Sequence, residues 1–144
     1  MNRTHRAVVG VLAAALLAVT LTGCGPSPSS WIAKKYHRVG TNTYQASLPP
    51  QAVAAAINRK FKAIDQVDDL ATLGSQGGVF LRYPKLVVGV TPYGPGSRIT
   101  VDKPSGGYNR YYSHVGRRWS APGSNGWNSH GIPSFRGGGP GSGK

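Results

Sequence analysis

The clearest helical pattern in the chain begins at Pro49-Pro50. Four apolar residues follow at spacings of four, four and three positions: Val53, Ile57, Phe61 and Ile64. This spacing places them on one face of a helix, where they can pack against a core. Proline suits the first turn of a helix, where its missing N–H group is not needed. The pattern therefore predicts a helix that begins at Pro49-Pro50 and ends near Lys62 or Ile64.

Three segments downstream have the composition of β-strands, being β-branched, aromatic or alternately apolar. These segments are residues 79–83, 86–91 and 98–102. Two residues lie between the first and second segments, and a Pro- and Gly-rich turn lies between the second and third. Parallel neighbours need a long crossover connection, so links this short favour antiparallel pairing. The three segments are therefore predicted to form a meander.

Two further segments complete the predicted fold. Residues 108–115 are expected to form either a strand or a helix, and weak periodicity predicts a loop that includes a turn of helix over residues 65–78. We therefore expect an α+β domain over residues 31–118, with one main helix packed on a three- to four-stranded antiparallel sheet. Fewer than ninety residues can bury one modest core.

The start of the chain has the pattern of an exported protein. Arg3 and Arg6 precede fifteen uncharged residues, 7–21, which is short for a membrane-spanning helix of about 20 residues. The run ends in Leu21-Thr22-Gly23-Cys24, which looks like the lipobox of bacterial lipoproteins. We therefore predict that residues 1–23 are a lipoprotein signal peptide and that Cys24 is the lipidation site.

The chemistry of a thiol explains this prediction. A cysteine can be alkylated to a thioether-linked diacylglyceryl group, and cleavage before Cys24 then leaves at least two acyl chains, enough for stable anchoring. An ordinary signal peptide cut elsewhere and an uncleaved helical anchor are the alternatives. Residues 24–30 are predicted to be a Pro/Ser spacer. The expected location is the outer face of the cytoplasmic membrane, where the protein is lipid-anchored and extracytoplasmic.

A second, shorter helix is predicted just after the spacer, over residues 31–39, with Ser30 as its N-cap. Its apolar face is opposed by three basic residues: Lys34, Lys35 and Arg38. Because this face lies close to the predicted anchor, contact with lipid head groups would contribute roughly 1 kcal/mol per residue. A simply solvated face is the alternative, and the pattern favours it.

Charge narrows the classes of partner. The chain has 17 Lys and Arg against 4 Asp and no Glu, a net charge of +13, and removal of residues 1–23 leaves +11. Outside the cytoplasm such a charge attracts anionic lipid or wall polymer through a screened field, or a membrane protein, and no nucleic acid is expected there. Simple solubility is the alternative use of the charge. A single cysteine excludes internal disulfides and thiolate zinc sites.

From residue 119 the composition becomes Gly-rich, with few large apolar residues. Such a segment cannot offset its own ordering entropy, so residues 119–144 are predicted to be a disordered basic tail. Arginines can pair with phosphates and aromatic rings can stack on sugars or cations. The candidate binding residues are Arg117, Arg118, Trp119, Trp127 and Arg136. A passive disordered terminus is the alternative.

One arrangement suggests an enzyme. Asp102 and His114 are candidates for the carboxylate and base of a hydrolase, and three serines are candidate nucleophiles: Ser97, Ser105 and Ser113. The Gly-x-Ser-x-Gly elbow is absent from the sequence, however, and His37, His114 and His130 are too scattered for a metal site. We therefore predict no catalytic residue, no metal and no cofactor, with the hydrolase as the alternative.

Four segments carry a family resemblance: Phe80-Leu81-Arg82-Tyr83, Gly96-Ser97-Arg98-Ile99, Gly107-Tyr108 and residues 135–144. They look like the uncharacterised actinobacterial lipoproteins grouped as domain-of-unknown-function family 4247. The resemblance implies a bacterial, membrane-anchored and extracytoplasmic protein. It implies no activity, so no residue role beyond that of Cys24 is carried over. The expected role is a non-enzymatic interaction or accessory module that binds envelope polyanions or a membrane partner.

Overall fold

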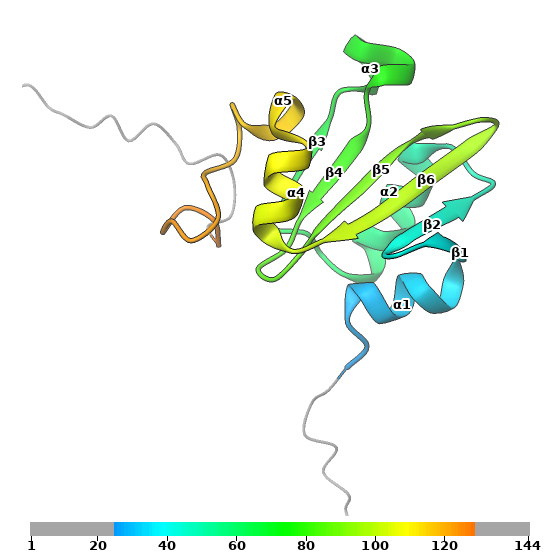
Figure 1. Cartoon of the computed structure of the whole chain (residues 1–144), viewed down its shortest axis with the longest axis horizontal. Coiled ribbons are helices and arrows are strands. Elements are labelled where there is room, and N and C mark those ends of the chain that lie inside the picture. The colour runs from blue at the N-terminus through cyan, green and yellow to red at the C-terminus, as the bar shows by residue number, and fades with distance from the viewer. Residues whose placement is uncertain (1–24, 129–144) are drawn as a thin grey trace, which may run out of the picture.

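A six-stranded antiparallel sheet lies at the centre of the computed structural model, which describes residues 25–128 (Figure 1). The strand order across the sheet is β1-β2-β6-β5-β4-β3, so the β5–β6 hairpin is central and β1 and β3 form the two edges. The strands are β1 (His37–Gly40), β2 (Thr43–Ala46), β3 (Asp65–Asp68), β4 (Val79–Arg82), β5 (Val87–Tyr93) and β6 (Gly96–Asp102).

Short helices cover both faces of this sheet. One face carries α1 (Pro28–Lys35) and α2 (Pro50–Lys60), and the other carries α4 (Pro104–Arg110) and α5 (Tyr112–Val115). Between β3 and β4 the chain forms α3 (Leu70–Leu73) and the 3-10 turn η1 (Gly74–Gln76), which project from one end of the sheet in Figure 1. The described residues thus form a small α+β structure.

The larger core lies between the sheet and α2. Val53 and Ile57 of α2 are fully buried, as the helical spacing predicts, and pack with the inward residues of β4, β5 and β6. The helix ends at Lys60, earlier than expected, and Phe61 lies half-buried at the edge of the core. α2 is the longest of several short helices among the described residues, so the expectation of one main helix is wrong.

A second core lies on the opposite face of the sheet. It contains Phe80, Val87, Tyr111, Val115, Trp119 and Trp127. Because both faces are covered here, all four residues of β4 are buried, which explains its nearly continuous apolar sequence. Successive side chains along β4 and β5 point to opposite faces of the sheet, so these strands contribute residues to both cores.

The expectation of three or four strands is wrong, since the structure has six. The three predicted strands correspond to β4, β5 and β6, whereas β1, β2 and β3 were missed. Each missed strand has four residues and little apolar alternation, so pairing with a neighbouring strand, rather than local propensity, decides its conformation. Residues 65–78, expected as a loop with a turn of helix, form the short helices α3 and η1 and also the unpredicted strand β3. Residues 108–115, expected as a strand or a helix, contain the end of α4 and the whole of α5.

The first helix also differs from the prediction. It begins at Pro28 inside the predicted spacer, with Ser27 rather than Ser30 as N-cap, and the Ser30 amide donates to Ser27 Oγ at 3.2 Å. It ends at Lys35, because the next residues form β1 as an edge strand. Val39, the last residue of the predicted helix, lies in this strand instead and is 45% exposed.

The packed part of the chain extends past the predicted limit at residue 118, because Trp119 and Trp127 are both buried. The predicted signal peptide with Cys24, and the end of the predicted tail with Arg136, lie outside the described residues. Within residues 25–128, none of the helices combines the length and the apolar character required to cross a membrane.

Candidate functional site

A fully buried arginine lies at the centre of the second core. Arg82 of β4 has no exposed surface, and its guanidinium carbon lies 5.7 Å from the ring centroid of Trp119 and 5.6 Å from that of Trp127. The two indoles meet edge to face at 5.9 Å. Cation–π attraction is strongest when the cation is removed from water, so each contact contributes on the order of 2 kcal/mol. This arrangement attaches the segment after α5 to the sheet.

Asp65 of β3 supplies the negative charge beside this arginine. It is directly opposite Arg82 in the β3–β4 register. Its carboxylate accepts hydrogen bonds from Arg118 Nε at 2.9 Å, Arg118 Nη2 at 3.1 Å and the Trp119 indole at 3.1 Å. Asp65 therefore binds the segment that covers this face of the sheet, and it lies opposite the sheet's buried cation.

The pKa values of this cluster follow from burial and from its charges. Burial alone would raise the pKa of Asp65, but the hydrogen bonds from Arg118, the Gln66 backbone and Trp119, together with the charge of Arg118, hold that pKa below its usual value. Burial lowers the pKa of the Arg82 guanidinium, while the charge of Asp65 opposes this effect. At neutral pH the cluster is thus an ionised carboxylate between two charged guanidinium groups.

These contacts correct the prediction of an extended, flexible binding segment. Trp119 and Trp127 are each only 3% exposed, so neither ring is free to stack on a ligand. Arg118 is committed to Asp65, Arg117 is exposed, and Arg136 lies outside the described residues. The physical reason is that two tryptophans supply enough apolar area to order a segment that is otherwise rich in glycine.

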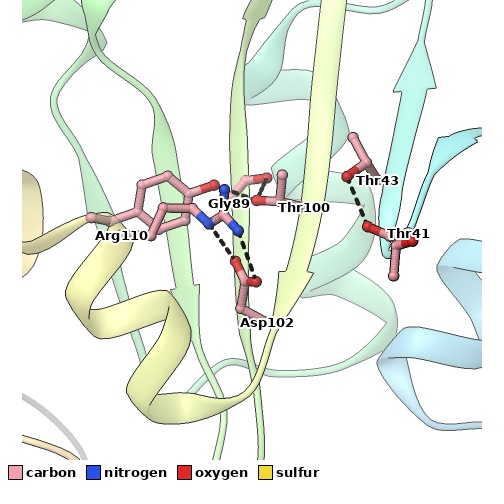
Figure 2. Close-up of polar contacts among 7 residues, drawn as sticks. Thr41, Thr43, Gly89, Thr100, Asp102 and Arg110 are labelled. Carbon is pink, nitrogen blue, oxygen red and sulfur yellow. Dashed lines mark hydrogen bonds and ion pairs between the residues drawn. The ribbon is translucent and has the colours of Figure 1, made fainter.

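The two residues of the hydrolase hypothesis have different partners. Asp102 pairs with Arg110, whose Nε lies 3.0 Å from Asp102 Oδ2 (Figure 2). His114 Nδ1 lies 2.5 Å from Asp69 Oδ2, and the other oxygen of Asp69 accepts the Gly78 amide. The structure therefore does not bring Asp102 and His114 together as a pair.

The Asp69–His114 contact is itself a carboxylate–imidazole pair, but the contacts around it hold parts of the fold together. The imidazole packs on the Phe80 ring at 4.7 Å between centroids. Asp69 also closes the segment from α3 to β4, because the Gly78 amide donates to its Oδ1 at 2.8 Å. The pair thus connects α5 to that segment.

The candidate serines are also dispersed. Ser97 is buried and donates to the Leu48 carbonyl at 2.6 Å. Ser105 and Ser113 are exposed on α4 and α5. Among residues 25–128, no group of three His, Cys, Asp or Glu side chains is placed so that it could hold a metal ion. These positions give the hydrolase hypothesis no assembled nucleophile within the described part of the chain.

A pair of hydroxyls fixes the end of helix α4 on the sheet. The Thr100 hydroxyl contacts the hydroxyl of Tyr111, the residue that follows α4. The Thr100 hydroxyl also donates to the Gly89 carbonyl at 3.5 Å (Figure 2). Burial raises the pKa of Tyr111, and the Thr100 hydrogen bond partly opposes that shift. A Cβ at Gly89 would overlap the Tyr111 ring, so glycine is required for this close approach.

The profile described as Domain of unknown function (DUF4247) matches residues 16–144. The chain belongs to this family. Neither a curated protein nor a solved structure matches it. The match confirms the predicted domain-of-unknown-function family, and membership in this family assigns no activity to any residue of the sites described above.

The sequence did not reveal the roles of Asp65 and Arg82, which lie opposite each other in the β3–β4 register and contact the tryptophans of the DUF4247 domain's second core. A signal for Arg82 was present, because it is the one charged residue in the predicted strand segment 79–83, whose other residues are all apolar or aromatic. Lys and Arg are almost never fully buried unless paired, so such an arginine indicates a partner. Asp65, which lies opposite Arg82, is one of only four acidic side chains in the chain, so few residues could have supplied the negative charge.

Proposed function

We propose that this DUF4247 protein is a membrane-anchored, extracytoplasmic bacterial lipoprotein. Its proposed role is that of a non-enzymatic interaction or accessory module that binds envelope polyanions or a membrane partner. The sequence around Cys24 supports the anchor, since a thiol after small residues and an uncharged run is suited to diacylglyceryl transfer. The charge distribution of the described residues supports the interaction role.

One observation carries the non-enzymatic part of this proposal: every carboxylate side chain is already engaged. Asp65 and Asp102 form ion pairs with arginines, and Asp69 contacts the His114 imidazole. The fourth, Asp68, accepts the Leu70 amide at 3.1 Å. The chain has no glutamate, so the described structure holds no spare carboxylate side chain for general acid–base chemistry.

The basic residues are arranged in the opposite way. Among residues 25–128, every Lys and Arg except Arg82 is exposed. Exposed cations that exceed the available carboxylates create a positive field, which attracts phosphate- or carboxylate-bearing polymers and surfaces. This distribution supports binding rather than catalysis.

The anchor is tested by intact-mass measurement on protein extracted from membranes. For the wild type, the proposal predicts a mass that corresponds to a chain beginning at Cys24 with a diacylglyceryl group attached. For the Cys24→Ser variant, it predicts the mass of a chain that still contains residues 1–23. Ser27, which lies three positions downstream, offers a matched control, since Ser27→Ala is expected to change neither the mass at Cys24 nor membrane retention. An unmodified Cys24 thiol on membrane-retained protein would overturn the anchor.

The interaction role is tested by photo-crosslinking in intact cells from exposed positions of the domain. The proposal predicts that envelope polymer, lipid or one defined membrane protein is captured by the anchored chain and much less by Cys24→Ser. Reproducible turnover of an ester or glycoside substrate by the purified chain, lost on His114→Ala, would instead establish the hydrolase.

A further inference from the structure

The ends of α1 and α2 form a basic hollow around a tryptophan. This hollow, about 250 Å³ in volume, is lined by Trp31, Lys35, Ala56, Arg59 and Lys60, which we call the Trp31 face. Lys35 comes from the last turn of α1, and Arg59 and Lys60 come from the last turn of α2. The two helices therefore bring three cations and one aromatic ring to the same patch of surface.

The cations of the Trp31 face are available to a ligand. All three are exposed, and none takes part in the ion pairs found among residues 25–128, which use Arg110, His114 and Arg118. The carboxyl ends of helices favour basic residues, which explains why cations are tolerated so close together. No carboxylate side chain lines the hollow. A ligand for this face is consequently anionic.

The aromatic part of the face favours an interface rather than a soluble ion. Trp31 is half-buried and is held edge-on by Tyr36 at 6.1 Å and Phe61 at 6.0 Å, with Lys35 Nζ 4.7 Å from its centroid. Tryptophan rings flanked by Lys and Arg are enriched at the depth of lipid head groups, where one part of the ring is wet and the other apolar. The combination matches a bilayer surface better than a dissolved phosphate.

The position of the face along the chain agrees with this assignment. α1 begins at Pro28, three residues after the first described residue and four after Cys24. Four extended residues span at most about 14 Å, and the eight residues of α1 add about 12 Å. Figure 1 shows the chain entering the domain at α1. An anchor at Cys24 would thus hold the Trp31 face within about 30 Å of the membrane.

We propose that the Trp31 face docks on anionic phospholipid and orients the anchored domain on the membrane. This inference rests on the proposed anchor at Cys24 and names the partner of the basic surface. Lys35, Arg59 and Lys60 contact head-group phosphates, while the exposed part of Trp31 enters the interface. Each cation near an anionic surface changes the docked-to-undocked ratio about five-fold, and the three together change it about 100-fold.

The test uses the full chain, produced in a bacterium that processes lipoproteins and reconstituted into vesicles. The vesicles contain phosphatidylcholine with brominated acyl chains, either alone or with about 30 mol % phosphatidylglycerol, a fraction chosen to give a negative surface potential. Bromine quenches only tryptophans at the bilayer, and Trp119 and Trp127 are buried in the protein. Quenching that disappears in Trp31→Phe therefore reports docking of the Trp31 face.

The expected result is strong quenching with phosphatidylglycerol at about 0.1 M NaCl, and its loss without phosphatidylglycerol or at about 1 M NaCl, where screening shortens to about 3 Å. The variant with Lys35→Gln, Arg59→Gln and Lys60→Gln also loses it. The matched control, Arg98→Gln with Lys103→Gln and Arg117→Gln, removes the same charge from exposed positions outside the hollow and keeps the quenching. Equal thermal melting of the variants shows that both remain folded.

Flotation of the same vesicles separates the two proposals. If the chain floats with neutral vesicles but Trp31 is never quenched, the anchor stands and the docking surface is wrong. If it floats only with anionic vesicles, and the Lys35 triple variant abolishes this, the docking surface stands and the anchor is wrong. If soluble poly(glycerol phosphate) binds through the three cations while anionic vesicles leave Trp31 unquenched, the occupant is a polymer and the lipid proposal is overturned.

Discussion

Replacing Asp65 with asparagine tests the account of the second core most directly. The Asp65 side chain is 8% exposed, accepts hydrogen bonds from Arg118 and Trp119, and is opposite the fully buried Arg82. Asparagine has nearly the same shape and keeps one carbonyl acceptor. It removes the negative charge from a site where two guanidinium groups converge.

The expected loss of unfolding free energy in Asp65→Asn follows from how deeply each partner of Asp65 is buried. Arg118 is 44% exposed, so the loss of its ion pair costs at most about 1 kcal/mol. The loss of the charged acceptor for the Trp119 indole costs about 1.5 kcal/mol. Removal of the charge that compensates Arg82 adds about 1 kcal/mol, because uncompensated charge is costly inside a protein. We expect Asp65→Asn to lower the free energy of unfolding by about 3–4 kcal/mol, or the Tm by roughly 15 °C.

The dependence on pH gives a second, independent signature. The pKa of Asp65 is lowered in the folded state, so its stabilisation is complete above the unfolded-state pKa of about 3.9 and is lost as pH falls through the lower folded-state pKa. Urea unfolding of the wild type and Asp65→Asn should therefore show a wide gap at about pH 7 that closes toward about pH 2.

Asp68→Asn is the matched control, because Asp68 lies on the same strand and is exposed. Its effect should stay within about 0.5 kcal/mol, as for most surface substitutions. If Asp65→Asn costs no more than Asp68→Asn, or if the gap between the wild type and Asp65→Asn is the same at every pH, the electrostatic reasoning about the second core is wrong.

Three further substitutions test individual contacts, each by chemical denaturation monitored by circular dichroism. Gly89→Ala should destabilise the fold by about 1–3 kcal/mol, because the added methyl group displaces the Tyr111 ring, and an unchanged midpoint would contradict that close packing. Trp127→Ala should lower the free energy of unfolding by about 3–5 kcal/mol, whereas Tyr112→Ala, at a side chain that is 60% exposed, should lower it by less than about 1 kcal/mol. Equal effects of the two substitutions would mean that the segment after α5 is not part of the core. Tyr83→Phe should cost about 1–2 kcal/mol, since its buried hydroxyl donates to the Phe61 carbonyl at 2.7 Å, and a neutral effect would refute that bond.

The parts of the fold that the sequence predicted are those governed by local periodicity. The stripe of Val53 and Ile57 and the alternation around Ile99 report burial directly, because each face meets a core. β1, β2 and β3 carry no such pattern. In β3 the sequence Asp-Gln-Val-Asp has one apolar residue, and its strand conformation comes from pairing with β4. That pairing depends on residues distant in the sequence and leaves no local trace.

The candidate site shows the same limit for a different reason. Average composition predicted disorder after residue 118, but two residues, Trp119 and Trp127, outweigh the surrounding glycines because each buries a large apolar area. The partner of Arg118, Asp65, lies 53 positions away, so no motif could indicate it. Asp102 and His114 were grouped by residue type alone, and the fold gives each another partner, Arg110 for Asp102 and Asp69 for His114.

The two edges of the sheet have a consequence for how copies of the domain behave when crowded. β1 is four residues long, exposed along its whole length and irregular between Arg38 and Gly40. β3 is equally short and has an aspartate at each end. Brief, charged and irregular edges are poor templates for adding a strand from another molecule. Many copies can therefore share a confined space without their sheets fusing into continuous β-structure.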